Sequence, residues 1–418
     1  MTELEIVDNN FAPLTAAQDV PPTLSFEDCD LIANAPPRDL SGVQALNLSD
    51  CTLDHAALQR WLDACPELAE LDIEGSQLGD LLWSSLPAKL KTLAIRGGEL
   101  RTLLQPRATG GLQVIELTAC KLQRVELPKS LDSLSRVSLA YNRELTECPE
   151  LPWSAAPFQL DLRGCGLTTL PTTGGVDKVA TLDASDNPIE ALPDSIAQFH
   201  SLGTLRLQKC RVQTIDPAIA SLPHLRELWL ADNPLSQLPD ELFDLKSLAV
   251  LELARCKLDA WPQHLHEASN LEVLLLAENQ IEAVPDDVVE LTELRNLSLW
   301  KTGLRRLPAT LQGLTHLRQL DLSYNPLTNL PELRGLPAFG YLGLCGMRDL
   351  DWRQGFDRLA ELDRIGNISF TNSNFTAFDR RVLDIPELER LDVNKTPVDA
   401  AEWQACRDSH PHVTIWGN

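Results

Sequence analysis

The chain has 418 residues of similar composition from end to end, which favours one long structure over several domains joined by linkers. Its 60 acidic residues outnumber 36 lysines and arginines, so the formal net charge of −24 repels phosphate backbones and anionic membranes. We therefore expect no nucleic acid and no membrane as partner. A basic protein partner fits this charge, and an acidic surface that only aids solubility fits it equally well.

The first residues, MTELEIVDNNFAPLTAAQDV, lack the basic start and the apolar core of a secretory signal. No stretch of the sequence approaches the roughly 20 apolar residues that a membrane-spanning helix needs. These features predict a cytoplasmic protein. Its 10 cysteines are then expected to be free thiols rather than a disulfide scaffold.

An internal repeat follows a predicted N-terminal cap over residues 1–20. Its frame is L-x-x-L-x-L-x-x-(N/C)-x-L, as in LRELWLADNPL from Leu225 and LRQLDLSYNPL from Leu317. The frame starts at Pro21, Val43, Leu68, Leu90, Leu112, Leu134, Pro157, Val179, Leu202, Leu225, Leu248, Leu271, Leu294, Leu317, Phe339, Ile365 and Leu388. Most steps are 22 or 23 residues, which predicts about 17 repeats over residues 21–409. A partial unit, HPHVTIW from His410, predicts a C-terminal capping strand over residues 410–418.

Each repeat is predicted to form one strand and one return segment. The L-x-L pair has the two-residue period of a strand, and the later apolar residues carry the chain back along the outside. Residues 53–68 and 347–364 have the apolar period of true helices. Pro193, Pro239, Pro285 and Pro308 favour short 3₁₀ or extended connections in the middle repeats.

This pattern resembles the leucine-rich repeat family over nearly the whole chain from Pro21. The linkers LPDSIAQFHSL from Leu192, LPDELFDLKSL from Leu238 and LPATLQGLTHL from Leu307 resemble the LPxxLxxL subclass of bacterial effectors and intracellular scaffolds. The resemblance implies a curved, horseshoe-like α/β solenoid. Its parallel sheet would line the concave face, with short helices, 3₁₀ turns or extended segments on the convex face.

The ninth position of the repeat alternates between cysteine and asparagine over much of the chain. It holds Cys29, Cys51, Ser76, Gly98, Cys120, Asn142, Cys165, Asn187, Cys210, Asn233, Cys256, Asn279, Thr302 and Asn325. Here the chain leaves the strand, so buried backbone groups need partners, and an asparagine amide can bridge the turns above and below it. Alternate cysteines would lie about 10 Å apart, beyond the reach of a disulfide. We therefore predict that this column is structural.

Few residues suggest chemistry. Cys406-Arg407-Asp408 resembles the C-x-D element of bacterial ubiquitin ligases that carry leucine-rich repeats, but only ten residues follow Asp408, and a capping helix over residues 399–410 explains the same letters. The pair His264/His266 lacks a cysteine or carboxylate partner at metal-ligand spacing. The pair His410/His412 could share a strand face near Cys406, but a solvated terminal cap is the favoured interpretation. We predict no catalytic residue, no metal, no cofactor and no enzymatic activity.

Outward residues of the strands are the candidate contacts for a partner. Aromatic and aliphatic residues gather there with flanking charges in the C-terminal half, a composition typical of an interface. The candidate partner-binding residues are Trp229, Glu252, Arg255, Leu275, Trp300, Asp321, Tyr324 and Tyr341. At the same positions of earlier strands stand Asp72, Glu116, Asp161 and Asp183, which either steer a basic partner or are simply solvated.

The leading hypothesis is a non-catalytic, monomeric solenoid that binds a protein partner of unknown identity. Low lysine against abundant arginine, alanine and leucine fits a high-GC bacterial gene, so a bacterial effector is one form of it. Such an effector would enter host cells by a route without a signal peptide. The alternatives are an inhibitor or scaffold in its own cytoplasm and, least favoured, a ligase that uses Cys406.

Overall fold

The computed structural model describes residues 2–16, 19–36, 40–105, 111–235, 237–336 and 339–417. The chain divides into two compact units, unit 1 (Met1–Arg211) and unit 2 (Val212–Asn418). The boundaries between the predicted cap, the repeat array and the capping strand stay predictions. Residues 1, 17 and 18 of that cap, 37–39, 106–110, 236, 337 and 338 of the array, and 418 of the strand lie outside the described residues.

The main sheet of unit 1 is built from parallel strands, one from each repeat and one, β1, that precedes the first repeat. They are β1 (Glu3–Val7), β2 (Thr23–Glu27), β3 (Ala45–Ser49), β4 (Glu70–Glu74), β6 (Thr92–Arg96), β8 (Val114–Thr118), β10 (Arg136–Ser138), β11 (Phe158–Asp161), β12 (Val179–Asp183) and β14 (Thr204–Arg206). Strand β1 extends this sheet from within the predicted N-terminal cap, because it pairs in register with β2.

The return segments of unit 1 differ along the chain. A second parallel sheet contains β5 (Gln77–Leu82), β7 (Glu99–Leu104) and β9 (Arg124–Val125), and β13 is a short strand (Ala191–Leu192). The helices are α1 (Ala12–Ala16) and α2 (His55–Ala64), and the 3₁₀ helices are η1 (Trp83–Ser85), η2 (Val176–Lys178) and η3 (Asp194–Gln198).

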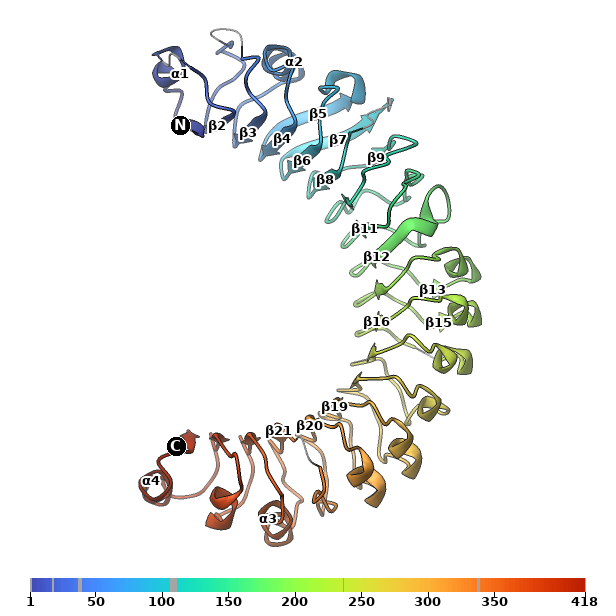
Figure 1. Ribbon diagram of the computed structural model, residues 1–418, viewed down its shortest axis with the longest axis vertical. Coiled ribbons are helices and arrows are strands. Elements are labelled where there is room, and N and C mark those ends of the chain that lie inside the picture. Colours follow the sequence, from blue (N-terminus) through green and yellow to red (C-terminus); the bar gives the residue numbers. More distant parts are fainter. Residues whose placement is uncertain are drawn as a thin grey trace. The chain divides into compact units, whose positions relative to one another are not determined.

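Unit 2 is more regular than unit 1. Its strands are β15 (Thr214–Ile215), β16 (Glu227–Trp229), β17 (Val250–Glu252), β18 (Val273–Leu275), β19 (Asn296–Ser298), β20 (Gln319–Asp321), β21 (Tyr341–Gly343), β22 (Asn367–Ser369), β23 (Arg390–Asp392) and β24 (Thr414–Trp416). From β16 to β24 each strand pairs in parallel with the next. Within the unit the strands β16 to β24 lie on one side and the helical segments on the other (Figure 1).

The helical segments of unit 2 follow the sequence pattern. They are η4 (Pro217–Ser221), η5 (Asp240–Asp244), η6 (Leu265–Glu267), η7 (Asp286–Glu290), η8 (Ala309–Gly313), α3 (Trp352–Ala360), η9 (Arg380–Asp384) and α4 (Ala400–Ser409). The three predicted helices are confirmed as α2, α3 and α4. The four prolines are confirmed as starts of 3₁₀ helices, because each precedes the first residue of η3, η5, η7 or η8.

Leucines in register form the core of both units. In unit 2 the middle residues of successive strands align from Leu228 through Leu251 and Leu274 to later repeats, and all are fully buried. Burying one such side chain contributes about 1.5–3 kcal/mol. Because one repeat cannot cover its own leucines, each repeat is stabilised mainly by its two neighbours.

A positive φ angle ends the strand segment of most described repeats. In unit 2 the residues with this left-handed backbone include Asp232, Arg255, Glu278, Lys301 and Tyr324, with φ angles between +53° and +61°. We call these residues the rim. A left-handed residue turns the chain sharply outward, which places the next residue in the buried Asn/Cys column.

The Asn/Cys column is a hydrogen-bonding ladder. The Asn279 side-chain oxygen accepts from the backbone N–H groups of Cys256 and Leu258, each at 3.0 Å. Its amide nitrogen donates to the carbonyls of Leu253 and Leu276, at 2.7 and 2.8 Å. The Cys256 thiol likewise reaches back, donating to Leu230 of the preceding repeat at 3.2 Å. The structural role is confirmed, but the amide bonds its own turn and the preceding repeat, not the turns on both sides.

All 10 cysteines of the chain are free thiols. Burial raises the pKa of Cys120 and Cys256 to about 12 and of Cys210 to about 11. A thiol in this column therefore stays protonated, which suits it as a hydrogen-bond donor and makes it a poor nucleophile.

Candidate functional site

The exposed face of the unit 2 sheet carries most of the predicted contact residues. The third residues of successive strands align in one row, Trp229, Glu252, Leu275, Ser298 and Asp321. All five are half-buried, because they point away from the leucine core but lean on their neighbours. The row is amphipathic, with an indole and an aliphatic side chain separated by a carboxylate.

Three predicted contact residues lie outside the strands. Arg255, Trp300 and Tyr324 were expected at outward strand positions, and that expectation is wrong. The strands here are only three residues long, so Trp300 follows β19 and the other two residues belong to the rim. All three still lie at the edge of the exposed sheet face, where the chain turns outward.

Trp300 and Tyr324 form an aromatic corner. Their ring centroids are 5.8 Å apart and the ring planes meet at 73°, an edge-to-face contact. The Lys301 ammonium lies 5.5 Å from the centre of the indole. Tyr324 is 40% exposed, and its ring lies so close to Gly346 that a Cβ there would stand 2.5 Å from Cδ1. The corner is thus held by residues of three neighbouring repeats.

A row of ion pairs along the rim positions Lys301. The ammonium donates to Glu278 at 3.0 Å, and Glu278 also accepts from Arg255 at 3.3 Å. Arg255 in turn binds both carboxylate oxygens of Asp232, at 2.5 and 2.7 Å. Hydrogen bonding to Lys301 lowers the pKa of Glu278, so this carboxylate is ionised at neutral pH. We call Asp232, Arg255, Glu278 and Lys301 the ion rail.

The remaining predicted residues lie near this corner or along the row. Trp229 donates its indole N–H to Glu227 at 3.1 Å. Asp321 accepts the N–H of Ser323 at 3.0 Å, and its carboxylate lies over Gly343, where a Cβ would stand 2.3 Å away. Tyr341 is the first residue of β21, and burial raises the pKa of its phenol well above the usual range.

Sequence reasoning missed the side chains that hold the aromatic corner. Glu278, Lys301 and Gly346 were not predicted, although Asp232, Arg255, Glu278 and Lys301 alternate in charge at 23-residue spacing. That alternation was the available signal, because residues one repeat apart become neighbours in a parallel stack.

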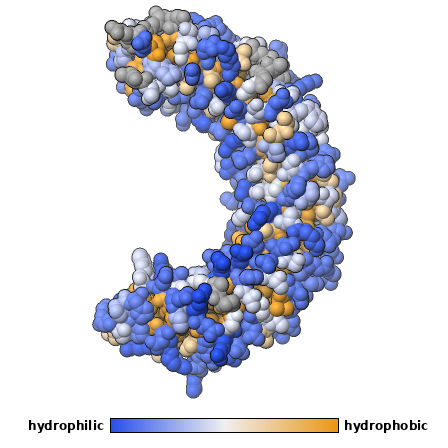
Figure 2. Space-filling view, viewed as in Figure 1, coloured by the Kyte–Doolittle hydropathy of each residue, from blue (hydrophilic) through white to orange (hydrophobic). Residues whose placement is uncertain are grey.

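Hydrophilic residues cover most of the face seen in Figure 2, with hydrophobic residues in small patches between them.

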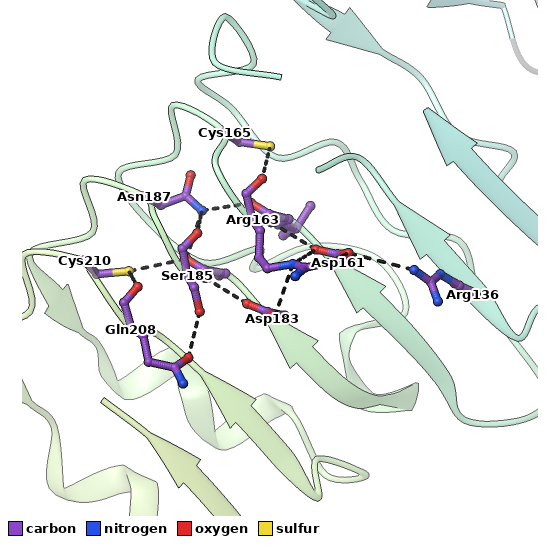
Figure 3. A network of polar contacts seen from close by, with 11 residues as sticks. Arg136, Asp161, Arg163, Cys165, Asp183, Ser185, Asn187, Gln208 and Cys210 are labelled. Atoms are coloured by element: carbon purple, nitrogen blue, oxygen red, sulfur yellow. Dashed lines mark hydrogen bonds and ion pairs between the residues drawn. The ribbon is translucent and has the colours of Figure 1, made fainter. Parts of the chain in front are cut away.

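The acidic strand residues of unit 1 form ion pairs with arginines. Arg96 joins Asp72 and Glu116 at 2.6 and 2.7 Å, and Arg136 approaches Glu116 at 3.3 Å. The contacts continue on Arg163, which pairs with Asp161 at 2.8 Å and Asp183 at 3.3 Å (Figure 3). Arginines of the same or a neighbouring repeat therefore pair with these carboxylates, and the question whether the acidic row steers a basic partner stays a prediction.

Two carboxylates of this network respond oppositely to their surroundings. Burial favours the protonated form of Asp161, but hydrogen bonds from Arg163 outweigh it and lower the pKa of Asp161. Burial dominates at Asp183 and raises its pKa, although Ser185 donates its N–H there at 3.1 Å. Asp161 thus stabilises the network as an anion, whereas burial disfavours the charged form of Asp183.

No catalytic arrangement surrounds Cys406. The residue is fully buried in α4, and burial raises the pKa of its thiol. Asp408 accepts from Gln404 at 2.9 Å, and residues two apart on a helix point in different directions. His264 contacts Glu267 at 2.9 Å and His266 contacts Asp287 at 3.3 Å, as surface pairs.

The described part of the chain offers no metal site and no membrane span. Among its histidines, cysteines and acidic residues, no group of three or more could hold a metal ion. None of its helices has the length and apolarity needed to cross a bilayer.

Comparisons with known proteins agree with this fold. A family model described as a leucine-rich repeat region matches residues 217–329. A leucine-rich repeat protein of Leptospira interrogans has a similar structure, with a TM-score of 0.69 and 23% identity over 99% of this chain and 100% of that chain. The plant peptide hormone receptor RGFR1, solved in complex with RGF2, has a TM-score of 0.54 and 20% identity over 89% of this chain and 65% of that chain. No curated protein sequence matches the chain.

Proposed function

The chain is a leucine-rich repeat protein, and we propose that it binds a protein partner through the exposed sheet face of unit 2 without catalysing a reaction. The aromatic corner of Trp300 and Tyr324 carries this proposal. Aromatic rings that are half-exposed, rigid and flanked by charges are typical of the centre of an interface. The proposed contact residues are Trp229, Glu252, Arg255, Leu275, Trp300, Asp321, Tyr324 and Tyr341.

The ion rail makes the corner suitable for binding. An indole that is already held in place loses little side-chain entropy when a partner covers it. Arg255 and Lys301 form ion pairs with carboxylates of the rim. Their charges therefore hold the rim side chains in place, and their contribution to attracting an acidic partner is small. A basic partner remains part of the proposal because the whole chain carries a net charge of −24.

Proteins of this fold include receptors for peptides, as the RGFR1 complex with RGF2 illustrates. For this chain we propose an interaction protein of bacterial origin, acting either as an effector inside host cells or as an inhibitor or scaffold in its own cytoplasm. The first version rests on the arginine-rich, lysine-poor composition and on the LPxxLxxL linkers. A ligase that uses Cys406 is disfavoured, because that thiol is buried.

Partner capture from host lysate and from bacterial lysate tests these versions. We expect Trp300→Ala to reduce capture at least about tenfold, a typical loss for an interface aromatic. Cys406→Ala and the exposed Gln280→Ala should capture as much as the unchanged protein. The proposal fails if the Trp300→Ala protein, with unchanged circular dichroism, captures the same partner equally well. Capture only from bacterial lysate would contradict the effector version and retain the scaffold.

A further inference from the structure

A second surface of unit 2 lies away from the sheet, in a groove beside α3. Its volume is about 820 Å³, and one wall is α3 with Trp352, Arg353 and Asp357. The other wall is residues 374–381, which lead into η9. This helix lies where several earlier repeats of unit 2 have a short 3₁₀ helix.

Aromatic rings form the floor of the groove. Phe356 and Phe375 meet edge to face with centroids 5.2 Å apart, and Phe378 packs on Phe356 at 5.5 Å. These phenylalanines are almost fully buried, so the floor is rigid. Trp352 packs on Phe375 at 4.8 Å and is half-exposed, which leaves part of an indole facing the solvent.

Two contacts tie the walls together. Near one end the Trp352 indole N–H donates to Asn374 at 3.0 Å. Near the other end Arg381 donates to Asp357 of α3 at 2.6 Å and also binds Asp379. The groove is therefore preformed, and a ligand would not have to order its walls.

The charge of the groove is opposite in sign to the charge of the chain. The lining holds three arginines (Arg353, Arg380 and Arg381) against Asp357 and Asp379, so its formal charge is 3 − 2 = +1, compared with −24 for the chain. Arg381 satisfies both aspartates. Within the described residues neither Arg353 nor Arg380 forms an ion pair with a carboxylate. Arg353 is exposed, and Arg380 lies beside the Cys406 thiol.

We propose that this groove docks an acidic segment of a partner protein, with carboxylate side chains on Arg353 and Arg380 and an apolar side chain on Trp352. Guanidinium groups bind carboxylates through paired hydrogen bonds, and the phenylalanine floor accepts an apolar residue that a free anion lacks. The site does not depend on the sheet face, so it adds a second contact surface to the proposed function.

Fluorescence anisotropy with the full chain tests the proposal directly. The probe is a fluorescein-labelled octapeptide of alternating glutamate and leucine, and its control is the same peptide with glutamine in place of glutamate. We expect saturable binding of the glutamate peptide, at least about tenfold tighter than the glutamine peptide at about 0.05 M salt. This difference should shrink at about 0.5 M salt, where the Debye length falls to about 4 Å.

Variants locate the binding site. Arg353→Gln and Arg380→Gln should each weaken the glutamate peptide about three- to tenfold, the usual effect of losing one partner charge. Arg358→Gln is the matched control, because Arg358 lies on the same helix, pairs with Glu361 and does not line the groove. Trp300→Ala should bind normally, so failure of the sheet-face proposal remains distinguishable from failure here.

Three results would overturn the groove proposal. They are equal binding of the two peptides, unchanged binding by both groove arginine variants, and displacement of the glutamate peptide by equimolar inorganic phosphate. The third result would indicate a simple anion site in place of a peptide groove. If Arg380→Gln alters the fold through its neighbour Cys406, the binding of the glutamate peptide by Arg353→Gln alone tests the proposal.

Discussion

Replacing Asn279 by leucine should destabilise unit 2 strongly, because the substitution keeps the size of the side chain and removes its hydrogen bonds. The backbone N–H groups of Cys256 and Leu258 would lose their acceptor in the core. Each buried, unsatisfied N–H costs about 1–3 kcal/mol, so the free energy of unfolding should fall by about 2–6 kcal/mol. The stranded carbonyls of Leu253 and Leu276 add to this cost.

Two matched variants calibrate the effect. Cys256→Ala removes one thiol donor from the same column and should cost about 0.5–1.5 kcal/mol, similar to a deleted methylene group. Gln280→Ala changes the exposed residue next to Asn279 and should cost less than about 0.5 kcal/mol. The expected order of stability loss is therefore Asn279→Leu, then Cys256→Ala, then Gln280→Ala.

Urea unfolding followed by both tryptophan fluorescence and far-UV circular dichroism measures this order. The urea dependence of the unfolding free energy must stay constant among the variants, because stacked repeats can unfold in stages. Equal midpoints for Asn279→Leu and Gln280→Ala would refute the reasoning. The column would then be held by packing alone, and its amides would not be a stabilising ladder.

Three further predictions concern the ion network, the thiols and the aromatic corner. Asp161 has a lowered pKa, so it stabilises the fold above its ordinary pKa near 3.8 and loses this effect as the pH falls through the lower folded value. Asp161→Asn should therefore lower the melting temperature at pH 7 but not near pH 2. Asp183→Asn removes a carboxylate of raised pKa and should leave the melting temperature at pH 7 unchanged or raise it. Equal decreases of the melting temperature in the two variants would contradict this reasoning. A maleimide should modify at most the two partly exposed cysteines of the folded chain and all 10 after unfolding without reductant, and fewer than 10 then would indicate disulfides. Gly346→Ala should cost about 1–2 kcal/mol, because alanine is strained at a φ angle of +63° and would displace the Tyr324 ring; unchanged near-UV circular dichroism would argue against that displacement.

Most of the fold could be predicted from the sequence because each repeat states the same pattern again. The leucine frame placed the strands, and the apolar period identified the helices around Trp61 and Trp352. The helix around Trp403 was expected as a cap. The N-terminal strand β1 was missed, because residues 3–7 lie before the first copy of the frame and were assigned to a cap. The predicted domain boundaries remain predictions, and the repeat frame runs unbroken through Arg211.

The candidate site was predictable in composition but not in geometry. Trp300 and Tyr324 were chosen as outward aromatics, yet their contact depends on where a three-residue strand ends and on a left-handed turn at Tyr324. The ion pairs of the acidic residues in unit 1 were not predicted, for a related reason. A one-dimensional pattern shows that Asp161 is outward, but not that Arg163 folds back onto it.

The alternation of amide and thiol in the ladder bears on how such an array could lengthen or shorten by recombination. Any deletion of one whole repeat preserves strand register, because Leu251, Leu274 and Leu297 are equivalent neighbours. Loss of the Asn279 repeat alone would nevertheless join the Cys256 repeat to the Thr302 repeat, leaving two consecutive junctions without a bridging amide. Loss of two consecutive repeats would keep an asparagine at every second junction. A pair of repeats is therefore the unit that this middle region could lose without breaking the alternation.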